Sequence, residues 1–222
     1  HQLSERSSQN ISSAMVAEFA LILPPILIAI TFHEYAHGYV AMKFGDPTAK
    51  MMGRLTLNPI SHMDPIGTIM LFIVHFGWAK PVPVDPRYFK DPKRDMLWVA
   101  LAGIGMNMVL AFISGVIFFV LFKTIPFQNG SYILQMLSFS IQINIALAVF
   151  NLFPIPPLDG SKVLRSLLPY QYEHIVVNLE RYGPFVLLGL VMFGMMTGVS
   201  IFWMIIGPFV QFFASLFTFG LM

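Results

Sequence analysis

The stretch MVAEFALILPPILIAITFHEYAHGYVAM, residues 15–42, decides the fold. It is mostly apolar and longer than the roughly 20 residues that a helix needs to cross a bilayer. Its second half nevertheless carries His33, Glu34 and His37. Ionisable side chains inside a membrane span are costly and usually serve a function. We therefore expect a membrane helix that carries a functional site.

The composition of the whole chain also indicates a membrane protein. The 222 residues are 56% hydrophobic and only 11% charged, with a mean hydropathy of +0.72. Soluble domains carry about 25% charged residues, so this chain has too few to cover a surface in water. The net charge of +2 gives no reason to expect a nucleic-acid partner. The absence of cysteine excludes disulfides and thiolate metal ligands.

The apolar stretches predict an all-α polytopic membrane protein with five to six transmembrane helices. After the first span they are residues 63–79, 96–122, 132–153 and two spans within 183–222 that turn near Gly198. We expect residues 14–222 to form a single membrane-embedded domain. Residues 1–13 are expected to be an N-terminal tail of added sequence, outside that domain.

The basic residues predict the topology. Eleven of the thirteen lysines and arginines fall in residues 43–54, 80–94 and 160–182. Cytoplasmic loops are enriched in these residues, so we expect all three segments on the cytoplasmic side of a prokaryotic inner membrane. Residues 55–79 would then enter the membrane and return as a re-entrant or β-hairpin segment, beginning with a short β-like run at 54–57. A plain six-span fold, with one basic segment outside, is the alternative.

Residues 33–37, HEYAH, match the metal-binding pattern HExxH. On a helix, His33 and His37 share a face with Cβ atoms about 5–6 Å apart. Both can bind one zinc ion, while Glu34 is placed to take a proton from a water on the metal. The alternative is a polar helix end at the membrane interface. The pair lies roughly 10–17 Å before the expected helix end near Phe44, which favours the metal centre.

A catalytic zinc takes three protein ligands and keeps one position open. The candidate third ligand is Asp159, in the proline-broken segment NLFPIPPLDG at residues 151–160. Spacing alone fits a helix-capping Asp equally well. The histidines His62, His75 and His174 each lack a spaced partner and are expected to be structural.

Together, HEYAH and NLFPIPPLDG resemble the site-2 protease family of intramembrane zinc metalloproteases, in its compact prokaryotic branch without a PDZ or CBS domain. Three further segments extend the likeness: GRLTLNP at 53–59, HMDPIGT at 62–68 and WAKPVPVDP at 78–86. The resemblance implies one zinc ion per chain bound by His33, His37 and Asp159, with Glu34 as the catalytic acid/base. It also implies membrane-spanning protein substrates. The sequence is compatible with a homo-oligomer.

Two asparagines are candidates for contacting the substrate. The run AGIGMN at residues 102–107 matches the family's AGP-x-x-N pattern, with Ile104 in place of proline. The amide of Asn107 suits a donor to the substrate or its oxyanion, or a hydrogen bond between helices. Asn151 has the same two interpretations.

Two other functions remain open. An HExxH membrane protease of another family would take its third ligand from a later helix, where Glu173 and Glu180 are the only glutamates. A metal transporter would need polar residues along a path, whereas here they gather at one depth near the cytoplasmic face. For the protease, we expect the extended segments near 54–58 and 80–84 to pair with an unwound substrate strand.

Overall fold

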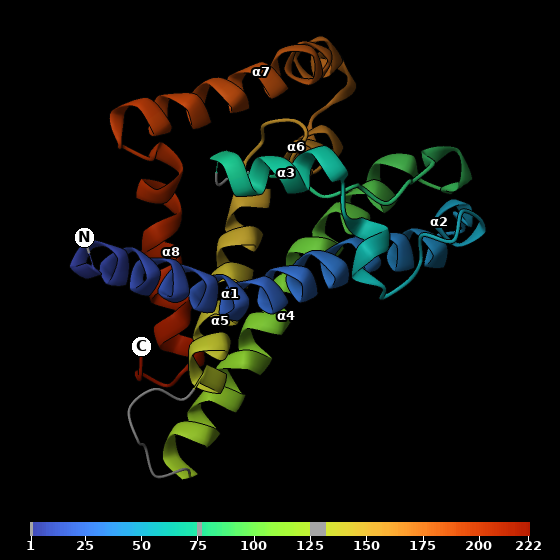
Figure 1. The fold of residues 1–222 in the computed structure, drawn as a ribbon. Helices are drawn as coiled ribbons and strands as arrows, with labels where there is room; N and C mark the ends of the chain where they lie inside the picture. Colours follow the sequence, from blue (N-terminus) through green and yellow to red (C-terminus); the bar gives the residue numbers. More distant parts are fainter. Residues whose placement is uncertain (1, 75–76, 125–131) are drawn as a thin grey trace.

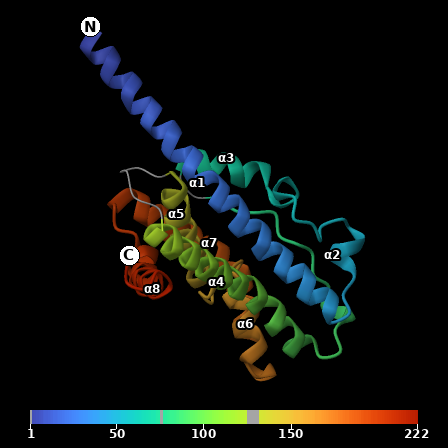
Figure 2. The ribbon, with the colours of Figure 1, turned by 90° about the horizontal axis from the view of Figure 1, so that it is seen from below.

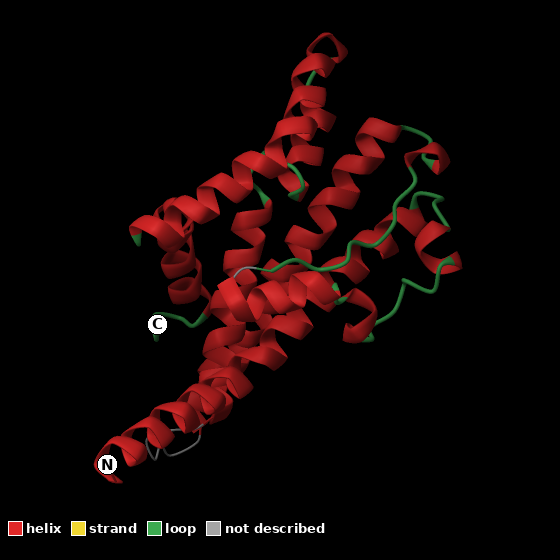
Figure 3. Ribbon diagram, turned by 45° about the horizontal axis from the view of Figure 1, so that its top comes forward, coloured by secondary structure: helices red, strands yellow, loops and turns green. Residues whose placement is uncertain are grey.

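A computed structural model describes residues 2–74, 77–124 and 132–222 of the chain. Within these residues the structure consists of helices and loops, with no β-strand (Figure 3). Its longer helices are α1 (Gln2–Lys43), α4 (Pro92–Thr124), α5 (Tyr132–Asn151), α7 (Glu173–Thr197) and α8 (Ile201–Phe217). The short ones are α2 (Thr48–Met51), η1 (Pro59–His62), α3 (Pro65–Val74), η2 (Pro86–Tyr88), α6 (Asp159–Leu167) and η3 (Tyr170–Tyr172).

The expected all-α architecture is confirmed, and the chain turns near Gly198, between α7 and α8, as expected. Among the described residues, four helices are long and apolar enough to cross a membrane: Val16–Lys43, Pro92–Thr124, Tyr132–Asn151 and Tyr170–Thr197. The last of these helices begins at Tyr170, whereas we expected it to begin at residue 183. It ends at Gly198, whose left-handed backbone (φ +72°) closes the helix. This leaves 17 residues for α8, at the short end of what a span requires.

Helices α1, α4 and α5 pack against one another and form the centre of the molecule, with α8 against α5 (Figure 1). The buried core between α4, α5 and α8 includes Phe118, Ile141, Ile145 and Val210. Helix α7 packs mainly on η3 and α6 and leaves much apolar surface exposed. The first part of α1 extends beyond the other helices (Figure 2). Residues 2–13, expected to be a tail, continue this helix.

The segment between α1 and α4 folds back on itself, so that residues 62–63 lie against residues 79–80. Met63 and Ala79 form an isolated antiparallel bridge, and the Lys80 N–H donates to the His62 carbonyl at 2.9 Å. Helix α3 lies between these two ends. The β-like run expected at 54–57 is not a strand. The N–H groups of Arg54 and Leu55 bond back to the Ala49 carbonyl, so they close a turn instead of a ladder.

The middle one of the three basic segments, residues 80–94, contacts the other two. The Arg54 guanidinium donates to the Lys80 carbonyl at 2.9 Å. The Lys93 ammonium donates to the Leu168 carbonyl and lies over the Tyr170 ring. Residues 80–94 therefore contact both residues 43–54 and residues 160–182.

Candidate metal centre

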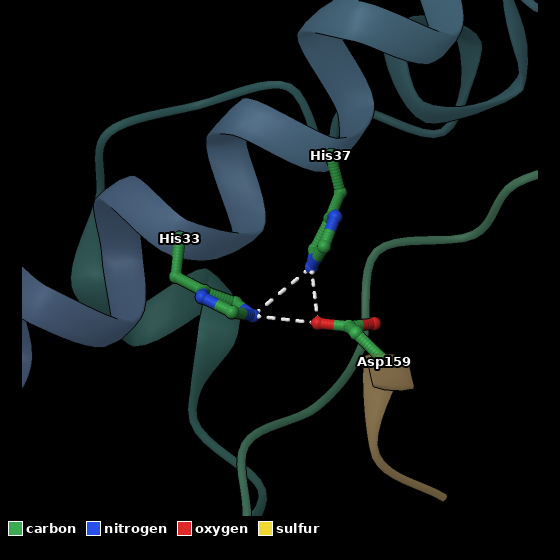
Figure 4. Close-up of side chains that lie close together, drawn as sticks. All are labelled: His33, His37 and Asp159. Carbon is green, nitrogen blue, oxygen red and sulfur yellow. Dashed lines mark hydrogen bonds and ion pairs between the residues drawn. The ribbon is translucent and has the colours of Figure 1, made fainter. Parts of the chain in front are cut away.

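Three side chains from distant parts of the sequence converge at one buried point (Figure 4). His33 and His37 lie one turn apart on α1, and Asp159 is the first residue of α6. The Asp159 Oδ2 atom is 3.0 Å from His33 Nε2 and 2.9 Å from His37 Nε2, and the two Nε2 atoms are 3.0 Å apart. Among the described residues, this is the one group of three or more His, Cys, Asp or Glu spaced to hold a metal ion.

The loop between α5 and α6 delivers Asp159 to this point. Helix α5 ends at Asn151, and prolines at 154, 156 and 157 prevent it from continuing. Gly160 lets the loop pack against the start of α6. A Cβ atom at this position would lie 2.3 Å from the Leu152 carbonyl oxygen and 2.4 Å from that of Phe153. The Asp-Gly pair therefore combines a buried acid with a position that has no room for a side chain.

Hydrogen bonds on the far side of each imidazole determine what faces Asp159. His37 Nδ1 is 2.7 Å from the Val99 carbonyl oxygen, and His33 Nδ1 is 2.6 Å from Asn107 Oδ1. Both partners are acceptors, so both Nδ1 atoms carry the proton. The Nε2 lone pairs then point at the Asp159 carboxylate. Three acceptor atoms at this spacing repel one another unless a cation lies between them.

The donor set fits zinc. Two imidazole nitrogens and one carboxylate oxygen are zinc ligands, and three protein ligands leave a position open for catalysis. In a tetrahedral site with zinc bonds of about 2.0–2.1 Å, neighbouring ligand atoms lie roughly 3.3 Å apart. The 2.9–3.0 Å separations here need to widen by only a few tenths of an ångström.

Lys162 holds the second oxygen of Asp159, a contact that the sequence analysis did not anticipate. Its Nζ atom donates to Asp159 Oδ1 at 2.9 Å from one turn further along α6. The i, i+3 spacing of an acid and a base on one helix was the available signal. Burial acts to raise the pKa of the Asp159 carboxyl. Where no cation lies between Asp159 and the two histidines, the rings are protonated, and the charge of His37, hydrogen bonds from both histidines and the charge of Lys162 lower that pKa by more.

The Glu34 carboxylate points at residues 80–85, which we call the strap. Its Oε2 atom accepts the Val82 N–H at 2.8 Å. The strap fits closely on α1 at Gly38, where an added Cβ would lie 3.0 Å from a Val82 methyl. Because Pro81 and Pro83 have no N–H and Val82 donates to Glu34, the strap has few donors left to pair with a substrate strand. The pairing expected near 80–84 stays a prediction.

The two candidate asparagines lie in different surroundings. Asn107 is completely buried and contacts His33, so the structure brings it to the cluster. Asn151 is the last residue of α5, and its amide donates to the Leu147 carbonyl of the same helix at 3.0 Å. Within the described residues, the Asn151 amide has no hydrogen bond to the three converging side chains.

The other candidate ligands lie apart from the cluster. Glu173 and Glu180 both pair with Arg165 and are 38% and 49% exposed. His62 is buried and its ring contacts the Thr56 carbonyl at 2.8 Å, while His174 is exposed. His75 is outside the described residues.

Comparison with known proteins identifies the family. The family model described as "Peptidase family M50" matches residues 127–196 of the chain. The "Putative zinc metalloprotease YwhC" of Bacillus subtilis is 42% identical over 186 residues, which cover 80% of this chain and 82% of that protein. This chain belongs to peptidase family M50. The assignment confirms the resemblance to site-2 proteases and does not favour a metal transporter.

More distant relatives also match. The "Putative zinc metalloprotease Rip2" of Mycobacterium tuberculosis is 27% identical over 77% of this chain and 66% of that protein. The "Zinc metalloprotease MJ0392" of Methanocaldococcus jannaschii is 25% identical over 87% of this chain and 48% of that protein. No solved structure matches the chain.

Gly103 gives the two imidazoles the room that they occupy. A Cβ atom at this position of α4 would lie 2.5 Å from His37 Nε2 and 2.7 Å from His33 Cε1. We expect Gly103→Ala to displace both rings and weaken zinc binding by about 10–100-fold, the range found when support of metal ligands is lost. Competition with a chelator measures the zinc Kd.

Gly105→Ala is the matched control for this substitution. Gly105 lies on the same helix, is exposed and has no atom within 4 Å of an added Cβ. The Gly105→Ala variant gains the same helix propensity as Gly103→Ala but creates no collision. Its zinc Kd should therefore equal that of the unsubstituted protein. Equal zinc affinity in the Gly103 and Gly105 variants would contradict the expected collision.

Proposed function

We propose that the chain is an intramembrane zinc metalloprotease that hydrolyses peptide bonds of membrane-spanning proteins. One zinc ion per chain would be held by His33, His37 and Asp159. The observation that carries the proposal is the convergence of two Nε2 atoms and one carboxylate oxygen within about 3 Å in a buried site, with both Nδ1 atoms facing hydrogen-bond acceptors. Membership of peptidase family M50 supports the reaction type, and the long apolar helices support substrates in the membrane.

Zinc supplies Lewis acidity, which makes water nucleophilic near neutral pH and polarises a carbonyl group. Glu34, next to His33 on α1, is the candidate to accept the proton of the attacking water and to return it to the leaving amine. The Val82 N–H holds one oxygen of its carboxylate and leaves the other for this exchange. Asn151 remains a candidate donor to the substrate oxyanion, because only one of its two amide N–H groups bonds to Leu147.

The proposed topology has residues 14–222 as one membrane-embedded domain, with residues 55–79 entering the membrane and returning. The Met63–Ala79 bridge supports this path because it joins the two ends of the stretch. The contacts among the three basic segments support placing them on one side, which is the cytoplasmic side by the positive-inside rule. The active site would lie nearer the cytoplasmic face of a prokaryotic inner membrane.

Removal and return of zinc tests the proposed function. The detergent-purified protein should cleave a single-span reporter, lose cleavage to the background rate after dialysis against a chelator, and recover it when zinc is restored. The number of zinc ions per chain should be one before dialysis, as measured by elemental analysis. A transporter would instead move zinc into proteoliposomes without cleaving the reporter. Cleavage that persists in zinc-free protein would contradict the proposal.

A further inference from the structure

A chain of hydrogen bonds between buried amides runs from His33 through α4 to α5. Asn107 Oδ1 lies 2.6 Å from His33 Nδ1, and Asn107 Nδ2 lies 2.8 Å from Asn144 Oδ1. Asn144 Nδ2 in turn donates to the Ser140 carbonyl at 2.8 Å. Asn107 and Asn144 have no exposed surface. Buried amides are costly unless they are hydrogen-bonded, so both side chains are tightly constrained.

Two backbone carbonyls, which can only accept hydrogen bonds, determine how the two asparagine amides are oriented. The Ser140 carbonyl requires the nitrogen end of the Asn144 amide, so Asn144 presents its oxygen to Asn107. Asn107 Nδ2 also meets the Ala29 carbonyl at 3.2 Å, which independently fixes the nitrogen end of that amide. Asn107 must therefore present its oxygen to His33, and His33 must donate from Nδ1.

We propose that Asn107 and Asn144 act together as positioning residues that hold His33 in the Nδ1–H tautomer and present its Nε2 lone pair to the metal. This rests on the metal site under the proposed function. It also gives Asn107 a role different from the oxyanion donor considered from the sequence. Both N–H groups of Asn107 are already used, one by Ala29 and one by Asn144.

The two histidines differ in what supports them. His37 donates to the backbone carbonyl of Val99, which no side-chain substitution removes. His33 depends on one side chain from α4 and, through it, on another from α5. Substitutions of Asn107 or Asn144 should thus disturb His33 and not His37. Asn144 has this effect only through Asn107, without contacting His33 itself.

Zinc affinities of four variants test the proposal, with Kd measured by chelator competition. Asn107→Ala should weaken binding by about 10–100-fold, as loss of an outer partner of a metal-ligating histidine does. Asn144→Ala should weaken it by a smaller factor. The double variant Asn107→Ala/Asn144→Ala should bind no more weakly than Asn107→Ala, because Asn144 acts only through Asn107. Asn107→Asp keeps an acceptor for His33 and should recover part of the affinity.

Ser114→Ala is the control for a merely structural role. Ser114 on α4 bonds to the Ser140 hydroxyl on α5 at 2.9 Å, so it joins the same two helices. That hydroxyl lies 3.4 Å from Asn144 Nδ2, but the shorter 2.8 Å bond from Asn144 Nδ2 goes to the Ser140 carbonyl, which the substitution of Ser114 leaves in place. Its zinc Kd should stay unchanged. The absorption of the cobalt-substituted protein gives a second readout, which should change in both asparagine variants and not in Ser114→Ala.

Three results would overturn the inference. They are a wild-type Kd and cobalt spectrum in Asn107→Ala, an additional loss from Asn144→Ala in the double variant, or an equal loss in Ser114→Ala. Failure of the unsubstituted protein to bind zinc would overturn the proposed function instead. If Asn107→Ala does not fold, Asn144→Ala and Asn107→Asp carry the comparison.

Discussion

Glu34→Gln is expected to reduce peptide-bond cleavage by about 10²–10⁴-fold, the usual contribution of a general acid–base group, while zinc stays bound. Glutamine has the same shape, and its oxygen can still accept the Val82 N–H, so the strap should remain in place. What the amide cannot do is accept and return a proton. Initial cleavage rates on a single-span reporter, together with zinc per chain from elemental analysis, measure the two effects separately.

Glu18→Gln provides the matched control on the same helix. Glu18 is exposed, so the same change of charge and shape there should alter neither cleavage nor zinc content. Retained cleavage in Glu34→Gln with zinc bound would remove Glu34 from the proton transfer. Loss of zinc from this variant would show that the carboxylate serves as a ligand.

Local patterns in the sequence were sufficient for part of the candidate site. His33 and His37 share a helix face because of their spacing alone, and the structure places them one turn apart. Asp159 lies 126 residues from His33, and its Asp-Gly pair fits a helix start as well as a ligand. Only the path of the loop after α5 separates these interpretations, and the resemblance to a family supplied what the spacing did not.

The supporting residues Gly103, Asn107 and Asn144 could not be assigned from the pattern. Their roles depend on which faces of α4 and α5 point toward α1. Membrane helices are apolar on all sides, so no amphipathic pattern reveals the inward face. Asn107 was singled out as a polar residue at membrane depth, but its partner remained ambiguous for this reason.

The fold was predictable to a similar degree. The apolar lengths placed α4, α5 and the end of α1 within a few residues, because the bilayer thickness sets the length of a span. The start of α1 was placed too late, since the helix begins at Gln2. In the last apolar region the turn near Gly198 was predicted correctly, whereas the start of the first of its two helices was placed too late. Residues 173–182 are polar enough to resemble a loop, yet α7 begins at Glu173. Pairing of Glu173 and Glu180 with Arg165 accommodates these charges on the helix.

Asp159→Ala is expected to weaken zinc binding by more than about 100-fold, beyond the 10–100-fold typical of an outer partner. The substitution removes one of three ligands and the negative charge that offsets the cation. The fold should survive it. Lys162 loses its partner, but its side chain is 46% exposed and can turn to water, and Gly160 still packs under the loop. Chelator competition gives the Kd, and thermal unfolding of the zinc-free protein checks the fold.

Glu173→Ala and Glu180→Ala are the decisive comparisons, because these residues would supply the third ligand in the other class of HExxH protease. Both carboxylates pair with Arg165, and neither contacts His33 or His37 within the described residues. Zinc affinity should therefore be unchanged in both variants. If Asp159→Ala kept its zinc while one glutamate variant lost it, the third ligand would have to come from α7. The convergence of Asp159 Oδ2 with both Nε2 atoms would then reflect protonated histidines instead of a metal centre.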